Sequence, residues 1–329
     1  MKPHWPEADA LPLKKRKLLK YLPPLLGLVV LAGVFIGLHG ALKKVSAGDV
    51  LAAFAATPQH QVFHALMLLA LSVCVMAIYD LPGVTFARRS ENFPRLGLHR
   101  IGLASFCAYA LSHVLGAPAL SSAAIRLRLY AQWGVPSAGI GRIIALSGST
   151  FAIGLSTMLG FLLLIQPHAV PVFGHAAPGV LRLGGAVLAG IAAAYVVAAK
   201  GRESVTLFGR EIALPGARLA LAQIIVAAAD MSISSAILYT VLPDAPGLSY
   251  LHVLSVYLAA FASGLFSGLP GGVGVFDSVL LLGLSAYLPP ATALGAILLF
   301  RVMYFLAPAC LAGICYAGHE LWVHTQAPK

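Results

Sequence analysis

Four ionic side chains lie within long apolar stretches of this sequence, where a charge needs a specific role. Asp230 lies twelve residues into one stretch, and Arg301 lies about ten residues into another. Arg126 and Asp277 each follow a Gly- and Pro-containing interruption. A carboxylate at such a depth can carry a proton or attract a cationic group, and the planar guanidinium of arginine binds phosphate through paired hydrogen bonds. These four residues are therefore the first candidates for a binding site.

Polar residues extend the surface around Asp230 along one helical face. Counted from Gln223, the residues Ala227, Asp230 and Ser234 follow at four, seven and eleven positions, which places them on one stripe of a helix. This stripe predicts that Asp230 and Ser234 face a cavity. The alternative is a buried carboxyl group that is neutralised by protonation or by an arginine.

The surroundings of Arg301 leave two roles open. Tyr304 follows Arg301 by three residues and shares its helical face. Arg301 is expected either to pair with Asp230 or Asp277, or to bind a phosphate group through its planar fork. In both cases Tyr304 is expected to lie at the same site.

The first interruption is followed by two arginines that face different ways. Arg126 shares a helical face with Tyr130, whereas Arg128 points about 200° away from Arg126 on a regular helix. We therefore expect Arg126 and Tyr130 at the cavity and Arg128 at the lipid headgroups. His113 is expected to relay protons or contact a headgroup, with a buried core histidine as the equal alternative. Asp80 ends its apolar stretch close to water, so its charge needs no special explanation, and a pairing with Arg88 or Arg126 is left open.

The composition identifies the environment of these side chains. Of the 329 residues, 59% are apolar and only 10% are charged, and the mean hydropathy is +0.88. A soluble domain carries about 25% charged residues, so this chain is expected to be an all-α polytopic membrane protein. The formal net charge of +11 is explained by basic loops on one membrane face rather than by binding to nucleic acid. The four cysteines and eleven histidines show no metal-ligand spacing, so no metal or cofactor is expected.

Apolar runs of spanning length divide the chain into about six full spans and two interrupted segments. A basic cytoplasmic leader is expected over residues 1–20, a single transmembrane domain over 21–318 and a short cytoplasmic tail over 319–329. Each full span has enough residues to cross a hydrocarbon core of ~30 Å. The full spans are predicted at 21–42, 62–81, 138–165, 180–199, 218–242 and 291–318.

The basic residues predict the orientation and the path of the interrupted segments. If both termini are cytoplasmic, 18 of the 22 Lys and Arg residues fall on the cytoplasmic side. This holds only if residues 101–133 and 250–288 each turn back within the membrane. We therefore predict two re-entrant helical hairpins in a multi-pass membrane protein.

The turns of the two hairpins resemble one another, because residues 110–118 and 262–270 both end in Gly-x-Pro. Hairpins entered from opposite sides would form an inverted repeat, although chance is a real alternative in a Gly-rich chain. Unpaired backbone at membrane depth survives only inside protein or beside a wet cavity, so two breaks imply a cavity, and helix N-termini there would favour an anion. The predicted turn residues are Gly116, Pro118, Gly268, Pro270, Gly271, Gly272 and Gly274.

Ordered motifs along the chain resemble those of a known bacterial family. Tyr79-Asp80, then Ser105-Phe-x-x-Tyr109 and Arg126-Leu-Arg128-Leu-Tyr130, then residues 267–277 and Arg301-x-x-Tyr304 follow one another. Together they resemble the transmembrane flippase region of the lysylphosphatidylglycerol synthase/flippase family. The likeness runs from about residue 20 to 318, and Asp277 stands where relatives commonly have Glu.

The resemblance implies a translocase of the bacterial inner membrane that moves an aminoacylated or related phospholipid between leaflets. Only eleven residues follow position 318, so we expect a stand-alone member without the aminoacyl-transferase domain, and no enzyme activity. Membrane phospholipids are the expected partners, and self-association into a homo-oligomer is left open. The alternatives are a secondary transporter of a small ion or metabolite, and a protein that handles polyprenyl-phosphate lipids. No nucleotide-binding Gly-x4-Gly-Lys-Ser/Thr motif occurs.

Overall fold

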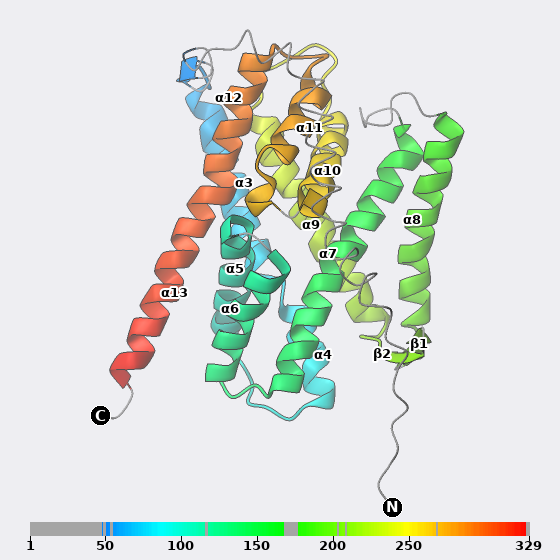
Figure 1. Cartoon of the computed structure of the whole chain (residues 1–329), viewed down its shortest axis with the longest axis vertical. Coiled ribbons are helices and arrows are strands. Elements are labelled where there is room, and N and C mark those ends of the chain that lie inside the picture. Colours follow the sequence, from blue (N-terminus) through cyan, green and yellow to red (C-terminus); the bar gives the residue numbers. More distant parts are fainter. Residues whose placement is uncertain are drawn as a thin grey trace, which may run out of the picture.

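The protein is an α-helical bundle with its long axis along the helices (Figure 1). The computed structural model describes residues 48, 51–52, 55–115, 118–167, 177–202, 204–207, 209–267 and 269–326. The predicted leader, the predicted span at 21–42, and the turn residues Gly116 and Gly268 lie outside the described residues. The helices are α3 (Gln59–Ile78), α4 (Leu81–Ser90), α5 (Leu98–Leu115), α6 (Pro118–Gln132), α7 (Ser137–Ile165), α8 (Pro178–Ala198), α9 (Ala217–Val241), α10 (Tyr250–Ser267), α11 (Val275–Leu284), α12 (Pro290–Phe300) and α13 (Ala307–Gln326).

Six helical segments are long and apolar enough to cross a membrane, which confirms the predicted all-α polytopic class. Five of them match predicted full spans, and the sixth, α10, is the first arm of the second predicted hairpin. Large apolar side chains remain exposed along these segments, as expected where lipid replaces water as the solvent. The six segments are Gln59–Ser90, Ser137–Ile165, Pro178–Ala198, Ala217–Val241, Tyr250–Ser267 and Pro290–Val323.

The first hairpin consists of α5 and α6, which pack side by side in one half of the molecule (Figure 1). Pro118 is the first residue of α6, a position where the missing N–H of proline costs nothing. The second hairpin consists of α10 and α11 and lies in the opposite half (Figure 1). Its turn contains the short helical segment Pro270–Gly272 (η3).

The second turn depends on glycine because its backbone is left-handed. The φ angles of Gly271, Gly272 and Gly274 are +59°, +58° and +84°. An L-residue with a side chain pays about 1–2 kcal/mol in that region, which glycine avoids. Gly274 is also the N-cap of α11, and its N–H donates to Asp277 Oδ2 at 2.9 Å.

The tips of the two hairpins meet near the middle of the molecule (Figure 1). A Cβ atom added to Gly271 would lie 3.2 Å from the backbone oxygen of His113 near the end of α5. The gap is too narrow for a larger residue, so the two turns touch through backbone. The two predicted hairpins thus approach one another from opposite halves of the molecule (Figure 1).

Three further features differ from a regular bundle. The span that starts at Gln59 breaks after Ile78, and α4 restarts at Leu81 with proline in its first turn. A continuous span joins α12 to α13 through a π-helical segment, Arg301–Leu306 (η4), of the kind often found at functional sites. The basic connection before α9 contains an antiparallel hairpin, β1 (Ser204–Leu207) and β2 (Arg210–Ala213), that the sequence analysis did not anticipate.

The helix α13 extends into the residues that were predicted to form the C-terminal tail. Residues 319–329 were expected to form a short tail after the last span, but α13 continues to Gln326. The end of α13 lies at the same end of the molecule as the β-hairpin and the connection between α6 and α7 (Figure 1). This end therefore gathers basic segments of the sequence, including Arg88, Arg89 and Arg142.

Candidate functional site

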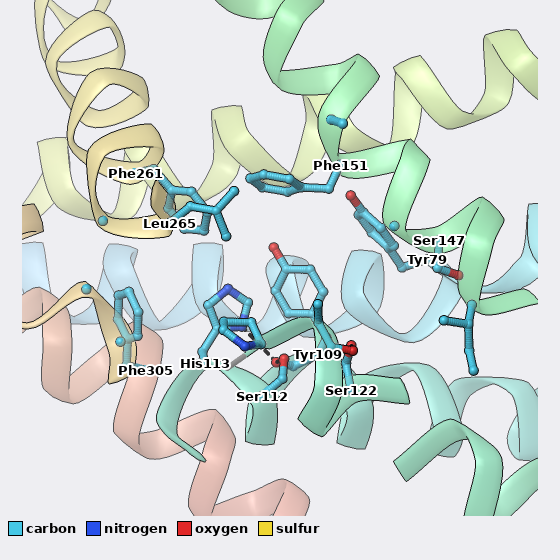
Figure 2. A pocket seen from close by; sticks show the side chains of 18 of the residues that line it. Tyr79, Tyr109, Ser112, His113, Ser122, Ser147, Phe151, Phe261, Leu265 and Phe305 are labelled. Carbon is cyan, nitrogen blue, oxygen red and sulfur yellow. Dashed lines mark hydrogen bonds between the residues drawn. The ribbon is translucent and has the colours of Figure 1, made fainter. Parts of the chain in front are cut away.

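A cavity of about 460 Å³ lies where the two hairpin tips meet. Side chains from α5, α7 and α10 converge on it, and Phe305 of the π-helical segment closes one side (Figure 2). The first hairpin contributes Tyr109, Ser112, His113, Pro118, Ala119, Ser122 and Arg126, and the second contributes Phe261, Gly264, Leu265, Leu269, Gly271, Gly272 and Phe276. The cavity predicted from the two backbone breaks is therefore present.

One wall of the cavity consists of small residues of α7 that are open to the outside. Ala145, Gly148 and Ala152 line the cavity and are exposed, as is Ala119 of α6 across from them. A Cβ atom added to Gly148 would have nothing within 4 Å. The cavity thus opens sideways, between α6 and α7, toward the space that lipid fills around a membrane protein.

Arg126 lines the cavity and forms an ion pair with Asp80, which is not part of the cavity lining. Its Nε and Nη2 atoms donate to Asp80 Oδ1 at 3.0 and 2.8 Å, and Nε also approaches Oδ2 at 2.9 Å. Ser147 and Tyr130 donate to the same carboxylate at 2.7 and 3.0 Å. Because the Arg126 and Asp80 side chains are only 6% and 0% exposed, this ion pair is buried, and both carboxylate oxygens of Asp80 accept hydrogen bonds.

The break between α3 and α4 is what places Asp80 in this network. Pro82 lacks an N–H and interrupts the helical bonding just after Asp80. The Ser105 hydroxyl compensates, because it accepts from the Asp80 N–H at 3.1 Å and donates to the Met76 carbonyl. Asp80 is thus held from α5 as well as from α6 and α7.

The remaining donors of Arg126 are available to the cavity. Guanidinium has five N–H groups, and the bonds described for Arg126 use only its Nε and Nη2 atoms. Arg126 is the single ionised side chain among the described residues that line the cavity, with His113 as a further titratable group. The N-terminal end of α6 opens on the same space, and its helix dipole favours negative charge there. An anionic group such as phosphate fits this corner.

Asp230 lies behind the cavity wall, within a group of tyrosines. The Tyr109 hydroxyl donates to Asp230 Oδ2, and Tyr109 itself lines the cavity. Asp230 is 2% exposed and Ser234 is 1% exposed, so the predicted stripe is buried and does not line this cavity as expected. Within the part of the chain that the structure describes, Asp230 Oδ1 and the Tyr304 hydroxyl lack a hydrogen-bond partner.

Asp277 and Arg301 pair with one another, which selects one of the alternatives left open by the sequence. Arg301 Nη2 donates to Asp277 Oδ2 at 2.8 Å, and both terminal nitrogens lie 3.3 Å from the Gly271 carbonyl. The guanidinium carbon also lies 5.3 Å from the ring of Phe276 and 5.2 Å from that of Phe305. Arg301 therefore stabilises the turn of the second hairpin. It is not part of the cavity lining.

The predicted site residues thus separate into three places. Arg126, His113, Pro118, Gly271 and Gly272 line the cavity, and Tyr130 supports Arg126 through Asp80. Asp230, Ser234 and Tyr304 lie together behind the wall, where Tyr304 stacks on Phe300 at 5.2 Å. Asp277, Arg301 and Gly274 hold the second turn. Pro270 begins the η3 segment of that turn.

One expectation about charge placement is wrong. Asp80 was expected to be near water, but it is 0% exposed and forms the central acceptor of the buried network, where Arg126 is the partner rather than Arg88. Arg128, which was expected to reach the headgroups, is 52% exposed, and its Nη2 donates to Glu320 of α13 at 2.8 Å. Sequence position along an apolar stretch gave no information on which helices flank a residue, and this is why the burial of Asp80 was misjudged.

The cavity also contains residues that the site prediction missed. Tyr109, Tyr79 and Ser147 were not candidates, although Tyr79 and Tyr109 belong to the motifs that carry the family resemblance. A polar residue beside a helix break was the available signal for Tyr79. Among the described residues, no group of three His, Cys, Asp or Glu side chains could hold a metal ion.

The fold and site define a class of multi-pass helical membrane protein in which two helical hairpins line a shared cavity. The inner membrane protein YbhN of Escherichia coli is 30% identical to this chain over 239 residues, which cover 71% of the chain and 73% of YbhN. The chain therefore belongs to the family of the inner membrane protein YbhN, and this relative supports an inner-membrane location. No family model matches the chain.

Two other relatives extend this comparison. The protein slr0712 of Synechocystis sp. is 29% identical over 313 residues, 94% of this chain and 95% of that protein. The phosphatidylglycerol lysyltransferase of Staphylococcus haemolyticus is 40% identical over 76 residues, 23% of this chain and 9% of that protein. The chain is thus similar to a limited part of the phosphatidylglycerol lysyltransferases.

Proposed function

We propose that this protein is a phospholipid translocase of the inner membrane. In this proposal the headgroup of an aminoacylated or other phospholipid passes through the cavity while its acyl chains stay in the bilayer. The chain carries out no chemical conversion of the lipid. The partial similarity to phosphatidylglycerol lysyltransferases supports a role connected with lipids.

The observation that carries the proposal is a laterally open cavity with one arginine in its wall. A phospholipid is amphipathic, so its carrier needs a polar place for the headgroup and an open side for the chains. Arg126 supplies free N–H donors for phosphate, and the open wall at Ala145, Gly148 and Ala152 lies next to it. Mostly apolar side chains elsewhere in the lining suit acyl chains, such as Phe151, Phe261 and Leu265.

The Asp80–Arg126 pair suits a carrier because it binds without holding a net charge at depth. An isolated arginine in hydrocarbon costs at least ~2.5 kcal/mol and would bind an anion tightly. Paired with Asp80, the guanidinium is neutralised but keeps donors to offer. A phosphate would then be held weakly enough to leave, which transport requires.

The same proposal includes an orientation. The end of the molecule that gathers the basic connections, including Arg88, Arg89 and Arg142, would face the cytoplasm, together with both termini. The first hairpin then enters from the cytoplasmic side and the second from the other side. The cavity between their tips would be reached in turn from the two leaflets.

The experiment is to fill the cavity and measure lipid movement. The full chain is reconstituted in vesicles, and the leaflet exchange of headgroup-labelled phospholipid is followed. Gly148→Phe places a ring in the cavity, whereas Gly184→Phe on α8 adds the same ring where a Cβ atom also has nothing within 4 Å but no cavity is lined. We expect Gly148→Phe to lower the exchange rate by about tenfold or more and Gly184→Phe to leave it unchanged. Equal rates for both variants and the wild type would contradict the proposal.

A further inference from the structure

Asp230 differs from the other buried and half-buried carboxylates that the structure describes because no arginine or lysine pairs with it. Among the residues whose side chains the structure describes, the buried and half-buried carboxylates Asp80, Asp277, Glu91 and Glu320 each form an ion pair with an arginine. Asp230 is 2% exposed and its only described hydrogen bond comes from a neutral hydroxyl. A carboxylate in such a place costs several kcal/mol when it is ionised and unpaired.

The groups that face Asp230 can exchange hydrogen bonds but cannot neutralise its charge. They come from four elements and from the break between α3 and α4, and all are phenols or hydroxyls. Tyr79 also interacts with Arg126 and Asp80, but these two charges neutralise one another. The facing groups are Tyr79 at the break between α3 and α4, Tyr109 on α5, Ser234 on α9 itself, Tyr257 on α10 and Tyr304 in the π-helical segment.

Tyr109 connects Asp230 to the cavity. Its ring lines the cavity, and its hydroxyl donates to Asp230 Oδ2. The ring of His113 lies 4.6 Å from that of Tyr109, and His113 Nδ1 lies 2.7 Å from the Tyr109 carbonyl oxygen. Because a carbonyl can only accept, Nδ1 carries the hydrogen, and Nε2 of a neutral His113 is left as an acceptor. Proton-accepting and proton-donating groups thus run from the cavity to Asp230.

We propose that Asp230 is a proton-binding site which the cavity reaches through Tyr109, and that lipid movement is coupled to its protonation. The proton step needs only hydronium as its proton donor. Tyr109 passes its hydroxyl proton to Asp230 Oδ2 and regains one from a hydronium ion in the cavity. The hydronium becomes water, Asp230 becomes neutral, and Tyr109 is unchanged. The coupling, unlike the proton site, rests on the proposed translocase function.

The position of Asp230 explains how one proton could affect both hairpins. Tyr109 belongs to the first hairpin, Tyr257 to the second, and Tyr304 to the π-helical segment that begins at Arg301. An ionised Asp230 attracts the hydroxyls of all three, whereas a neutral one donates a proton of its own. A ligand shifts a conformational equilibrium only through such a difference between two states. The protonation state of Asp230 on α9 would thereby affect both hairpins that line the cavity.

The first test measures the proton itself, on the reconstituted full-length protein without any transport assay. Infrared spectra are recorded across a pH titration, and the carbonyl stretch of a protonated carboxylic acid is followed. We expect a protonated carboxyl band at neutral pH that Asp230→Asn removes and Asp244→Asn, an exposed carboxylate, retains. Tyr109→Phe should keep the band but slow its exchange with the medium. If the wild type shows no such band, or if Asp230→Asn leaves it unchanged, the proton site is disproved.

The second test measures the coupling. A pH gradient is applied across vesicles, and the accumulation of labelled phospholipid in one leaflet is followed. We expect accumulation for the wild type, its loss in Asp230→Asn, and normal behaviour of Asp244→Asn. Lipid exchange that ignores the pH gradient, or that follows a sodium gradient instead, overturns the coupling. The carboxyl band without any lipid exchange would instead contradict the translocase function and leave the proton site intact.

Discussion

The two hairpins carry charges at similar places after their turns, but they hold them in different ways. In the first, the Arg126 and Asp80 side chains are 6% and 0% exposed, and Ser147 and Tyr130 complete the carboxylate's bonds. In the second, the Arg301 and Asp277 side chains are 16% and 17% exposed, and Arg301 also reaches the Gly271 carbonyl. The first pair ties helices together, whereas the second pair holds a turn.

This difference predicts how the two hairpins respond to change. A buried pair that is bonded from three elements fixes the first hairpin against α4 and α7, so that hairpin should behave as a rigid wall. The second hairpin depends on glycine backbone and on one arginine from the last span. Its tip, which touches the first hairpin at the His113 backbone, should therefore be the more easily displaced part of the cavity.

The largest effect is expected from breaking the first pair. Asp80→Ala leaves Arg126 buried without its partner, which should lower the free energy of unfolding by about 3–5 kcal/mol. Thermal unfolding of the purified protein in detergent measures this change. Asp244→Ala, at an exposed carboxylate, should stay close to the wild type, and a similarly small effect of Asp80→Ala would show that the first hairpin is not fixed by this pair.

A smaller effect is expected at the second pair. Arg301→Ala removes hydrogen bonds to Asp277 and to the Gly271 carbonyl, and such bonds to charged groups contribute about 1.5–3 kcal/mol. Partial exposure of both side chains places the expected loss in the lower part of that range. The matched control is Arg182→Ala on the exposed face of α8. A loss as large as that of Asp80→Ala would remove the distinction between the two hairpins.

The turn of the second hairpin can be tested separately from its arginine. In Gly272→Ala the new Cβ would lie 2.9 Å from the Cα of Gly264, at a φ of +58° that costs about 1–2 kcal/mol for alanine. We expect a loss of about that size, together with faster proteolysis of the turn. Gly184→Ala on α8 should be neutral or stabilising. If both variants have the same stability, the left-handed turn is not a constraint on this hairpin.

The smallest effect is expected at the exposed pair between α6 and α13. The Arg128 side chain is 52% exposed and bonds Glu320, so water and salt screen the interaction. Arg128→Ala should change the unfolding temperature slightly, and the difference should vanish at high salt. A large, salt-independent effect would mean that the first hairpin is held at its outer end as well as at its tip.

The sequence predicted the positions of the breaks better than the partners of the charges. Pro118 and the glycines at 271, 272 and 274 are local signals, because a missing donor or a left-handed φ acts on the chain where it occurs. Asp80 gave no such signal. Its burial arises from α5, α6 and α7, which are distant in sequence, and only their packing makes Arg126 its partner.

The choice between alternatives at Arg301 depended on the same kind of information. The spacing between Arg301 and Tyr304 could be read from the sequence. The sequence did not show that the guanidinium pairs with Asp277, or that Asp230 is hydrogen-bonded by a tyrosine instead. The β-hairpin before α9 was also missed, because a short polar connection of this kind shows no strand pattern longer than four residues. Tertiary contacts, rather than local propensity, decide these features.

The most direct test of the account is to find where a lipid headgroup rests inside the protein. A phospholipid with a photoreactive headgroup is added to vesicles containing the wild-type chain, and the labelled peptides are identified after irradiation. We predict that the photoreactive headgroup labels residues that line the cavity, around Ser147 and Phe151 of α7 and at Ser122 of α6. Label confined to the two ends of the helices, with none at these residues, would contradict it.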